Sequence, residues 1–261
     1  MGEVYVITSG KGGVGKTTTT ANLGAALAMC QNRVVIIDAD IGLRNLDVVM
    51  GLENRIVYNI IDVAEGRCRI SQALIRDKRF EELYLLPAAQ TNNKTDITPK
   101  DMIRICDTLK KEFDYILIDC PAGIERGFEN AIAGADKSIV VTIPEVSAVR
   151  DADRIIGLLN SSGLTESQLI INRLRVDLVK RGEMLSVEDM LDILAIELIG
   201  IIPDNKDIVI TTNRGEPVVT NEKSLTGKAY KNIARRMMGE EVRYLELDIK
   251  KSFLQRLFST N

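Results

Sequence analysis

The feature that most constrains this chain is a glycine-rich segment over residues 10–18. It reads Gly-Lys-Gly-Gly-Val-Gly-Lys-Thr-Thr, follows a short apolar run and precedes a helix-like pattern. The spacing satisfies the phosphate-loop pattern G-x-x-x-x-G-K-[ST] in the strand-loop-helix context that this motif requires. The segment therefore predicts a loop that surrounds the phosphates of a nucleotide, and a turn with incidental lysines is the alternative.

Each residue type in this loop has a physical reason for its place. Glycines let the backbone turn so that successive N–H groups face phosphate oxygens, and the following helix start adds its positive end. We expect Lys16 to reach the β- and γ-phosphates and the Thr17 hydroxyl to ligate Mg²⁺. The predicted phosphate-binding set is Gly10, Lys11, Gly12, Gly13, Val14, Gly15, Lys16, Thr17 and Thr18.

Short apolar runs alternate with amphipathic stretches along the rest of the chain. This alternation predicts a doubly wound α/β fold with a mostly parallel sheet flanked by helices. We predict a single P-loop ATPase domain over residues 1–245. The predicted strands cover residues 4–8, 34–38, 83–87, 115–119, 138–142, 169–172 and 198–203, and the predicted helices include 18–28, 100–112, 148–160, 187–196 and 228–238.

The composition excludes several classes of protein. The chain has no histidine, which excludes Ser-His-Asp and Cys-His hydrolases and most zinc sites. A net charge of −3 gives no general attraction to nucleic acid, so we expect no nucleic-acid partner. The sequence contains no run of about 20 apolar residues, so no membrane span is predicted. Four scattered cysteines, expected to be small buried thiols rather than metal ligands or disulfides, are Cys30, Cys68, Cys106 and Cys120.

Carboxylates follow two of the predicted strands, at the edge where open α/β sheets bind ligands. Asp119 is predicted to hold Mg²⁺, usually through water, and Asp38 to support the metal shell. Asp40 is predicted to position the attacking water. For each of the three, a surface aspartate that caps a helix is the alternative. Because histidine is absent, carboxylates and lysines must carry any chemistry.

The loop lysine Lys11 and the Gly12-Gly13 step resemble the deviant Walker A motif, K-G-G-x-G-K-[ST], of the MinD/ParA family of ATPases. The resemblance implies ATP and Mg²⁺ as cofactors. It also implies an ATP-dependent homodimer in which Lys11 reaches the phosphates bound by the partner subunit, a role similar to that of an arginine finger. Residues Lys11, Lys16 and Asp40 are then the catalytic set.

Other segments resemble the MinD branch of this family, namely residues 38–47, 119–125, 144–147, 150–151, 153–154 and 215–217. In the family an asparagine that Asn172 matches contacts adenine, and Pro203 and Asp204 occupy the corresponding second loop. An asparagine that closes a turn at a strand end is the alternative for Asn172.

The MinD resemblance implies a protein that positions the division septum of a cell or plastid. It implies a MinE-like activator of hydrolysis and a MinC-like division inhibitor, both bound near the dimer edge at Ser147, Asp151 and Asp153. A solvated helix start is the alternative for these three residues. A ParA-like DNA-partitioning ATPase is the alternative function, although it would need a basic groove on the folded domain. An iron–sulfur carrier would need closely spaced cysteines.

The last segment, residues 246–261, is predicted to form a C-terminal amphipathic membrane-targeting helix. Its apolar face carries Phe253, Leu254, Leu257 and Phe258, and the basic residues that flank or oppose this face are Lys250, Lys251 and Arg256. This pattern predicts a cytoplasmic protein that binds anionic lipid on the inner face of the cell membrane, or on the stromal face of the plastid inner envelope. A terminal helix that packs on the protein's own core is the alternative.

Overall fold

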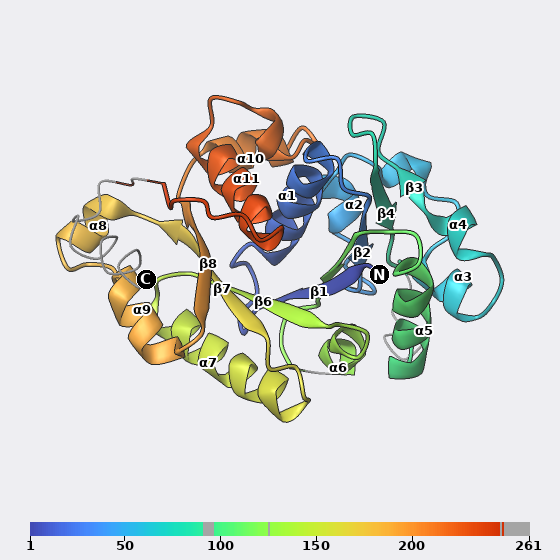
Figure 1. The fold of residues 1–261 in the computed structure, drawn as a ribbon, viewed down its shortest axis with the longest axis horizontal. Helices are drawn as coiled ribbons and strands as arrows, with labels where there is room; N and C mark the ends of the chain where they lie inside the picture. Colours follow the sequence, from blue (N-terminus) through green and yellow to red (C-terminus); the bar gives the residue numbers. More distant parts are fainter. Residues whose placement is uncertain (91–96, 125, 246, 248–261) are drawn as a thin grey trace.

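A computed structural model describes residues 1–90, 97–124, 126–245 and 247 of the chain. Its centre is an eight-stranded sheet with helices on both faces (Figure 1). The strand order is β3-β4-β2-β5-β1-β6-β7-β8, and each strand pair except β3–β4 is parallel. The predicted doubly wound α/β fold is confirmed.

All seven predicted strand regions are strands in the structure. Their bounds are β1 Glu3–Thr8, β2 Val34–Asp38, β4 Leu83–Leu86, β5 Tyr115–Asp119, β6 Lys137–Thr142, β7 Ser167–Leu174 and β8 Glu197–Pro203. The additional strand β3, Ile75–Arg76, pairs antiparallel with β4 at one edge. It has only two residues, which is too short for an alternating or apolar run to mark it in the sequence.

The helices pack in two layers, one on each face of the sheet. One hydrophobic core joins the sheet to α3, α5, α6, α7 and α9, and the other joins it to α1, α2 and α11. The helix bounds are α1 Lys16–Met29, α2 Leu46–Val49, α3 Ile60–Ala64, α4 Ile70–Ala73, α5 Pro99–Leu109, α6 Arg126–Ile132, α7 Val146–Ser161, α8 Val176–Lys180, α9 Val187–Leu194, α10 Asp207–Thr212 and α11 Leu225–Met237.

The central strands are apolar on both sides because both faces are covered. Along β2, for example, Val35 and Ile37 belong to one core, whereas Val34 and Ile36 belong to the other, and all four are fully buried. Such continuous burial explains why the strands appear in the sequence as unbroken apolar runs rather than alternating ones. The packing holds the strand ends rigidly, which fixes the loops that follow them.

The expectation of buried thiols is correct for Cys106 and Cys120 but wrong for Cys30, which is exposed, and Cys68 is half-buried. Cys30 lies at the C-terminal end of α1, where the chain turns at Gln31 with a left-handed φ of 64°. The turn places the thiol outside the core. All four cysteines are free thiols in the structure.

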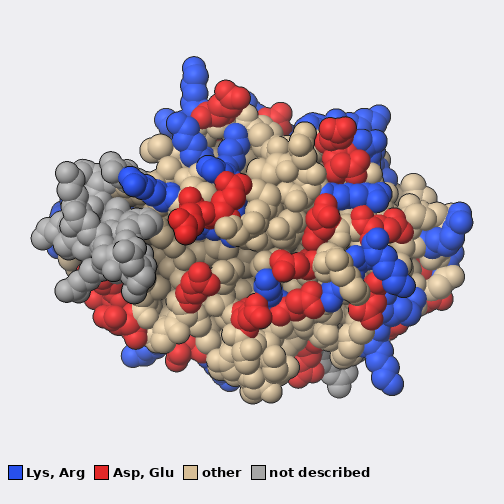
Figure 2. Space-filling model, viewed as in Figure 1, with Lys and Arg blue, Asp and Glu red and all other residues tan. Residues whose placement is uncertain are grey.

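In the described parts of the chain, no helix has the length and apolarity that crossing a bilayer requires. Figure 2 shows acidic and basic side chains mixed over the viewed face of the molecule. Of the predicted membrane-targeting helix over residues 246–261, the structure describes only Leu247, which is buried in the core. The residues predicted to contact lipid lie outside the described residues, namely Lys250, Lys251, Phe253, Leu254, Arg256, Leu257 and Phe258.

Candidate functional site

The strand order brings the predicted site together. Strands β2, β5 and β1 are neighbours and parallel, so their carboxyl ends meet at one edge of the sheet. Asp38 on β2 is in register with Asp119 on β5, and Asp119 is in register with Ile7 on β1. The phosphate loop follows β1 directly. Three segments far apart in the sequence therefore share one site.

The loop backbone has the conformation that phosphate binding needs. Gly13 and Gly15 have left-handed φ values of 78° and 101°, which side chains disfavour. A Cβ atom at Gly10 would overlap the backbone of Asp151, so glycine is also required there. Within the described residues, the N–H groups of residues 10–18 donate to no protein acceptor. These N–H groups, beside the N-terminus of the 14-residue helix α1, fit a polyphosphate anion.

Asp38 and Asp119 form a buried carboxylate pair. Their exposed fractions are 0% and 1%. Burial, followed by the charge of Asp119, raises the pKa of Asp38 well above its ordinary value. Burial likewise raises the pKa of Asp119 to about 6. Two buried carboxylates at paired positions of neighbouring strands are a suitable charge partner for a divalent cation, which suits the predicted Mg²⁺ site.

Hydroxyl groups of α1 orient Asp119. The Thr20 hydroxyl donates to Asp119 Oδ1 at 3.2 Å, and the Thr17 hydroxyl lies close enough to lower the pKa of Asp119. Lys16 is also buried, and its charge lowers the same pKa. Thr20 is a site residue that the sequence motif did not indicate. Its position four residues after Lys16, on the same side of the helix, was the available signal.

Asp38 also shapes the segment that follows it. One carboxylate oxygen accepts the Asp40 N–H at 2.9 Å and the other accepts the Leu46 N–H at 3.2 Å. These bonds fold residues 38–46 over the strand end. Asp40, the predicted water-positioning residue, is half-buried there and contributes to the raised pKa of both buried aspartates.

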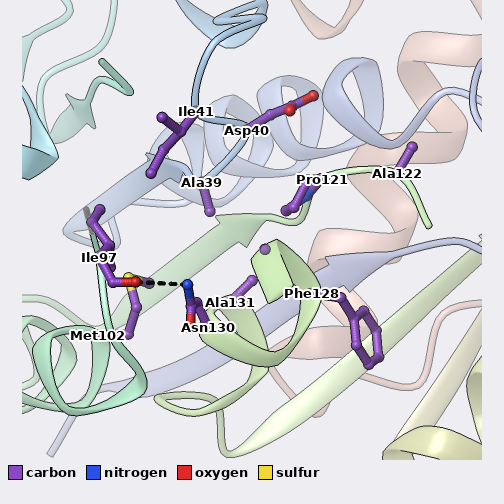
Figure 3. Close-up of a pocket in the computed structure, with 11 residues that line it drawn as sticks. Ala39, Asp40, Ile41, Ile97, Met102, Pro121, Ala122, Phe128, Asn130 and Ala131 are labelled. Atoms are coloured by element: carbon purple, nitrogen blue, oxygen red, sulfur yellow. Dashed lines mark hydrogen bonds between the residues drawn. The ribbon is translucent and has the colours of Figure 1, made fainter. Parts of the chain in front are cut away.

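A cavity of about 330 Å³ adjoins Asp40 on the side of α5 and α6 (Figure 3). Its walls include Ala39 and Ile41 from the segment after β2, and Pro121 and Ala122 from the segment after β5. Asp40 is its only charged lining residue among those described. The segments after β2 and β5 thus line one largely apolar cavity beside Asp40.

Lys11 is held by the start of α7. Its Nζ lies 3.3 Å from Glu145 Oε2 and 3.5 Å from Ser147 Oγ. Both side chains of the ion pair are exposed, by 43% and 54%. The predicted partner residues Ser147, Asp151 and Asp153 all lie on α7, whose backbone packs against Gly10. Glu145, which ends the turn before α7, was not predicted from the sequence. No pattern of neighbouring residues indicates its contact with Lys11, which lies 134 residues earlier in the chain.

The predicted base-binding residues lie near the carboxyl ends of β7 and β8. Asn172 is buried at 6% exposure, and its amide Nδ2 donates to the Val14 carbonyl at 2.7 Å. Asp204 follows the last residue of β8, Pro203, and its N–H donates to the Leu174 carbonyl. Asn172 and the 203–204 loop thus lie at the ends of neighbouring strands. Their contact with adenine stays a prediction.

Comparison with known proteins decides the family. A family model described as an AAA domain matches residues 2–171. The chain is 56% identical over 244 residues to the septum site-determining protein MinD of Bacillus subtilis (strain 168), covering 93% of this chain and 91% of that protein. The chain belongs to the MinD family of P-loop ATPases.

Similarity to solved structures agrees with this membership of the MinD family. The chain resembles the Aquifex aeolicus MinC:MinD cell division protein complex at a TM-score of 0.86 and 53% identity, covering 92% of this chain and 97% of that one. It resembles MinD of Pyrococcus horikoshii, complexed with Mg-ADP, at a TM-score of 0.82 and 30% identity, covering 91% and 96%. The predicted fold, ATPase class and MinD resemblance are confirmed, and septum-site determination is the function of the family.

Proposed function

We propose that this chain binds Mg·ATP in the loop of residues 10–18, dimerises with ATP and acts at a membrane surface to place the division septum. The supporting observation is the position of Lys11. Its ammonium group stands at the mouth of the loop, exposed, with its charge balanced by Glu145. An exposed lysine there can reach a second subunit without rearranging the core.

The ion pair with Glu145 is easy to exchange. An exposed pair of this kind contributes about 0–1 kcal/mol, because water and side-chain entropy oppose it. A charge-assisted bond to a phosphate in a drier dimer interface contributes more, roughly 1.5–3 kcal/mol. ATP on the facing subunit therefore draws Lys11 away from Glu145. In the dimer, Lys11 neutralises charge that develops on the terminal phosphate.

The remaining site residues have complementary roles in this proposal. Lys16 and the loop N–H groups bind the phosphates, and Thr17, Asp38 and Asp119 hold Mg²⁺, partly through water. Mg²⁺ supplies neutralisation of the phosphate charge. Asp40 orients the water that attacks the terminal phosphate. Since carboxylates bind a metal in their deprotonated form, Mg²⁺ bound by Asp38 and Asp119 would favour loss of the protons that burial otherwise retains on them.

A regulatory partner on α7 would act close to the chemistry. Ser147 contacts Lys11, and Asp151 abuts the first residue of the loop. A MinE-like activator or a MinC-like inhibitor that binds Ser147, Asp151 and Asp153 would thus contact the place where Lys11 pairs with its own subunit. Its affinity would differ between this state and the dimer, in which Lys11 binds the phosphates of the other subunit. By reciprocity, a partner that favours the dimer is itself bound better when ATP is present.

Membrane attachment follows from the tail sequence. One short basic helix binds anionic lipid weakly, whereas two helices on one dimer bind bivalently and gain about 10²–10⁴ in avidity. ATP then loads the protein onto the cytoplasmic face of the membrane, or the stromal face in a plastid, and hydrolysis releases it.

The test combines sedimentation velocity with pelleting on vesicles of an anionic phospholipid. Wild type should dimerise and pellet with ATP but not with ADP. Lys11→Ala should bind ATP yet remain monomeric and in the supernatant. Equal pelleting of wild type with ATP and ADP would contradict the coupling, and a dimeric Lys11→Ala protein would contradict the role of Lys11.

A further inference from the structure

The last residues of β7 depart from a regular strand. The pairing of β7 with β8 changes register between Ile171 and Leu174. Between them, Arg173 has a left-handed φ of 55°, a conformation that is unfavourable for a non-glycine residue. Bulges of this kind commonly turn a side chain away from the direction that the strand would give it. Asn172 lies within this irregular segment, directly before Arg173.

The Asn172 side-chain amide connects two backbone groups. Its Oδ1 accepts the Arg173 N–H at 2.9 Å, which compensates the unusual conformation of Arg173. Its Nδ2 donates to the Val14 carbonyl of the phosphate loop at 2.7 Å, across 158 residues of sequence. A Cβ atom at Gly15 would overlap the same Nδ2. Asn172 and the loop are therefore packed in direct contact.

The Val14 carbonyl and the Gly15 N–H belong to one trans peptide. In a trans peptide the C=O and the N–H point in opposite directions, and the plane between them is rigid. A bond that holds the Val14 oxygen from the β7 side consequently fixes where the Gly15 N–H points. That N–H donates to no protein acceptor among the described residues. It is one of the groups available to a phosphate oxygen.

We propose that Asn172 positions the phosphate loop through the Val14 carbonyl, independently of any contact that it makes with a nucleobase. The inference rests on the nucleotide site proposed above. An amide nitrogen carries two N–H groups. One is used by Val14, so the other can still meet adenine. Loop geometry and base recognition would then depend on a single side chain.

A ligand without a base separates the two roles. Binding of Mg·ATP and of Mg·tripolyphosphate is measured by calorimetry or by competition with a fluorescent nucleotide, for wild type and Asn172→Ala. A positioning role predicts that both dissociation constants rise by a similar factor, roughly three- to tenfold for one hydrogen bond. A role in base contact alone predicts weaker ATP binding and unchanged tripolyphosphate binding, and this result would overturn the inference.

Asn32→Ala is the matched control. The Asn32 amide also donates to a backbone carbonyl, that of Leu27 at 3.1 Å, but at the far end of α1. It should change neither dissociation constant. Wild type that binds neither ligand would instead refute the nucleotide site itself, so the two failures are distinguishable.

A measurement without ligand completes the test. In the nucleotide-free protein, NMR order parameters of the Gly15 and Lys16 amides should fall in Asn172→Ala and stay unchanged in Asn32→Ala. Unchanged order parameters in the Asn172 variant would also overturn the positioning role. If the alanine variant does not fold, as judged by circular dichroism, Asn172→Thr removes the same bond with a residue that suits a strand.

Discussion

Asp38 and Asp119 lie in register on neighbouring parallel strands and are both buried, beside the loop that follows β1. A buried carboxylate is unfavourable in its charged form unless a cation or a bound proton compensates its charge. Burial raises the pKa of Asp119 to about 6, from an ordinary value of 3.8. The pair therefore links proton binding, metal binding and stability.

The contribution of Asp119 to the stability of the nucleotide-free protein should fall as the pH rises from about 4 to about 6. The folded state retains the Asp119 proton over this range, whereas the unfolded chain has released it, so raising the pH favours unfolding. The shift corresponds to about 3 kcal/mol for this group. The measurement is the melting temperature as a function of pH for wild type and Asp119→Asn. The difference between the two curves should shrink at low pH, and a pH-independent difference would contradict the raised pKa.

Lys16→Ala should abolish ATP hydrolysis and vesicle binding together. Lys16 is buried beside Asp119 and is the charge that the loop offers to the phosphates. We expect turnover to fall roughly 10²-fold or more. Phosphate release and vesicle pelleting measure the two effects. Lys111→Ala, an exposed lysine that follows α5, is the control and should retain both activities.

Asp40→Ala should separate binding from turnover. Asp40 is not predicted to hold the phosphates, so ATP affinity should change little while hydrolysis falls strongly. The variant should then accumulate on vesicles with ATP, because release requires hydrolysis. Calorimetry with ATP and a vesicle-release time course are the measurements. Wild-type turnover in this variant would remove Asp40 from the role of positioning water.

Glu145→Gln should let the dimer form at a lower ATP concentration. The change removes the charge that holds Lys11 in its own subunit. Because an exposed ion pair contributes about 0–1 kcal/mol, the ATP concentration for half-maximal dimerisation should fall up to about fivefold. Sedimentation in an Asp40→Ala background, where ATP persists, gives this concentration. Glu183→Gln is the matched control, because Glu183 forms a similarly exposed ion pair with Arg181 at 3.1 Å, between α8 and α9. A shift equal in both variants would contradict the role of Glu145.

A chain truncated before Lys250 should bind nucleotide and dimerise but no longer pellet with anionic vesicles. The basic and apolar residues removed supply the proposed lipid contact. Full-length protein with uncharged vesicles is the control for the electrostatic part. Undiminished pelleting of the truncated chain would show that membrane binding lies elsewhere.

The sequence by itself determined those features that depend on contiguous residues. The loop over residues 10–18 contains all its glycines and both lysines in one segment, and the buried strands appear as apolar runs because each strand is covered on both faces. Asp38 and Asp119 could be placed in the site from sequence because both end a parallel strand, and such ends meet at one edge. The MinD resemblance extended these local signals to most of the chain.

Only the tertiary structure decided which distant groups touch. The Thr20 contact with Asp119, the Glu145 contact with Lys11 and the Asn172 bond to Val14 depend on strand order, on side-chain direction and on a bulge in β7. The exposure of Cys30 depends on where α1 ends. Residue patterns indicate burial and turn preference, which depend mainly on residues that are close together in the sequence. Contacts between segments 99 to 158 residues apart are set by the whole sheet, because each strand's register is fixed by its neighbours.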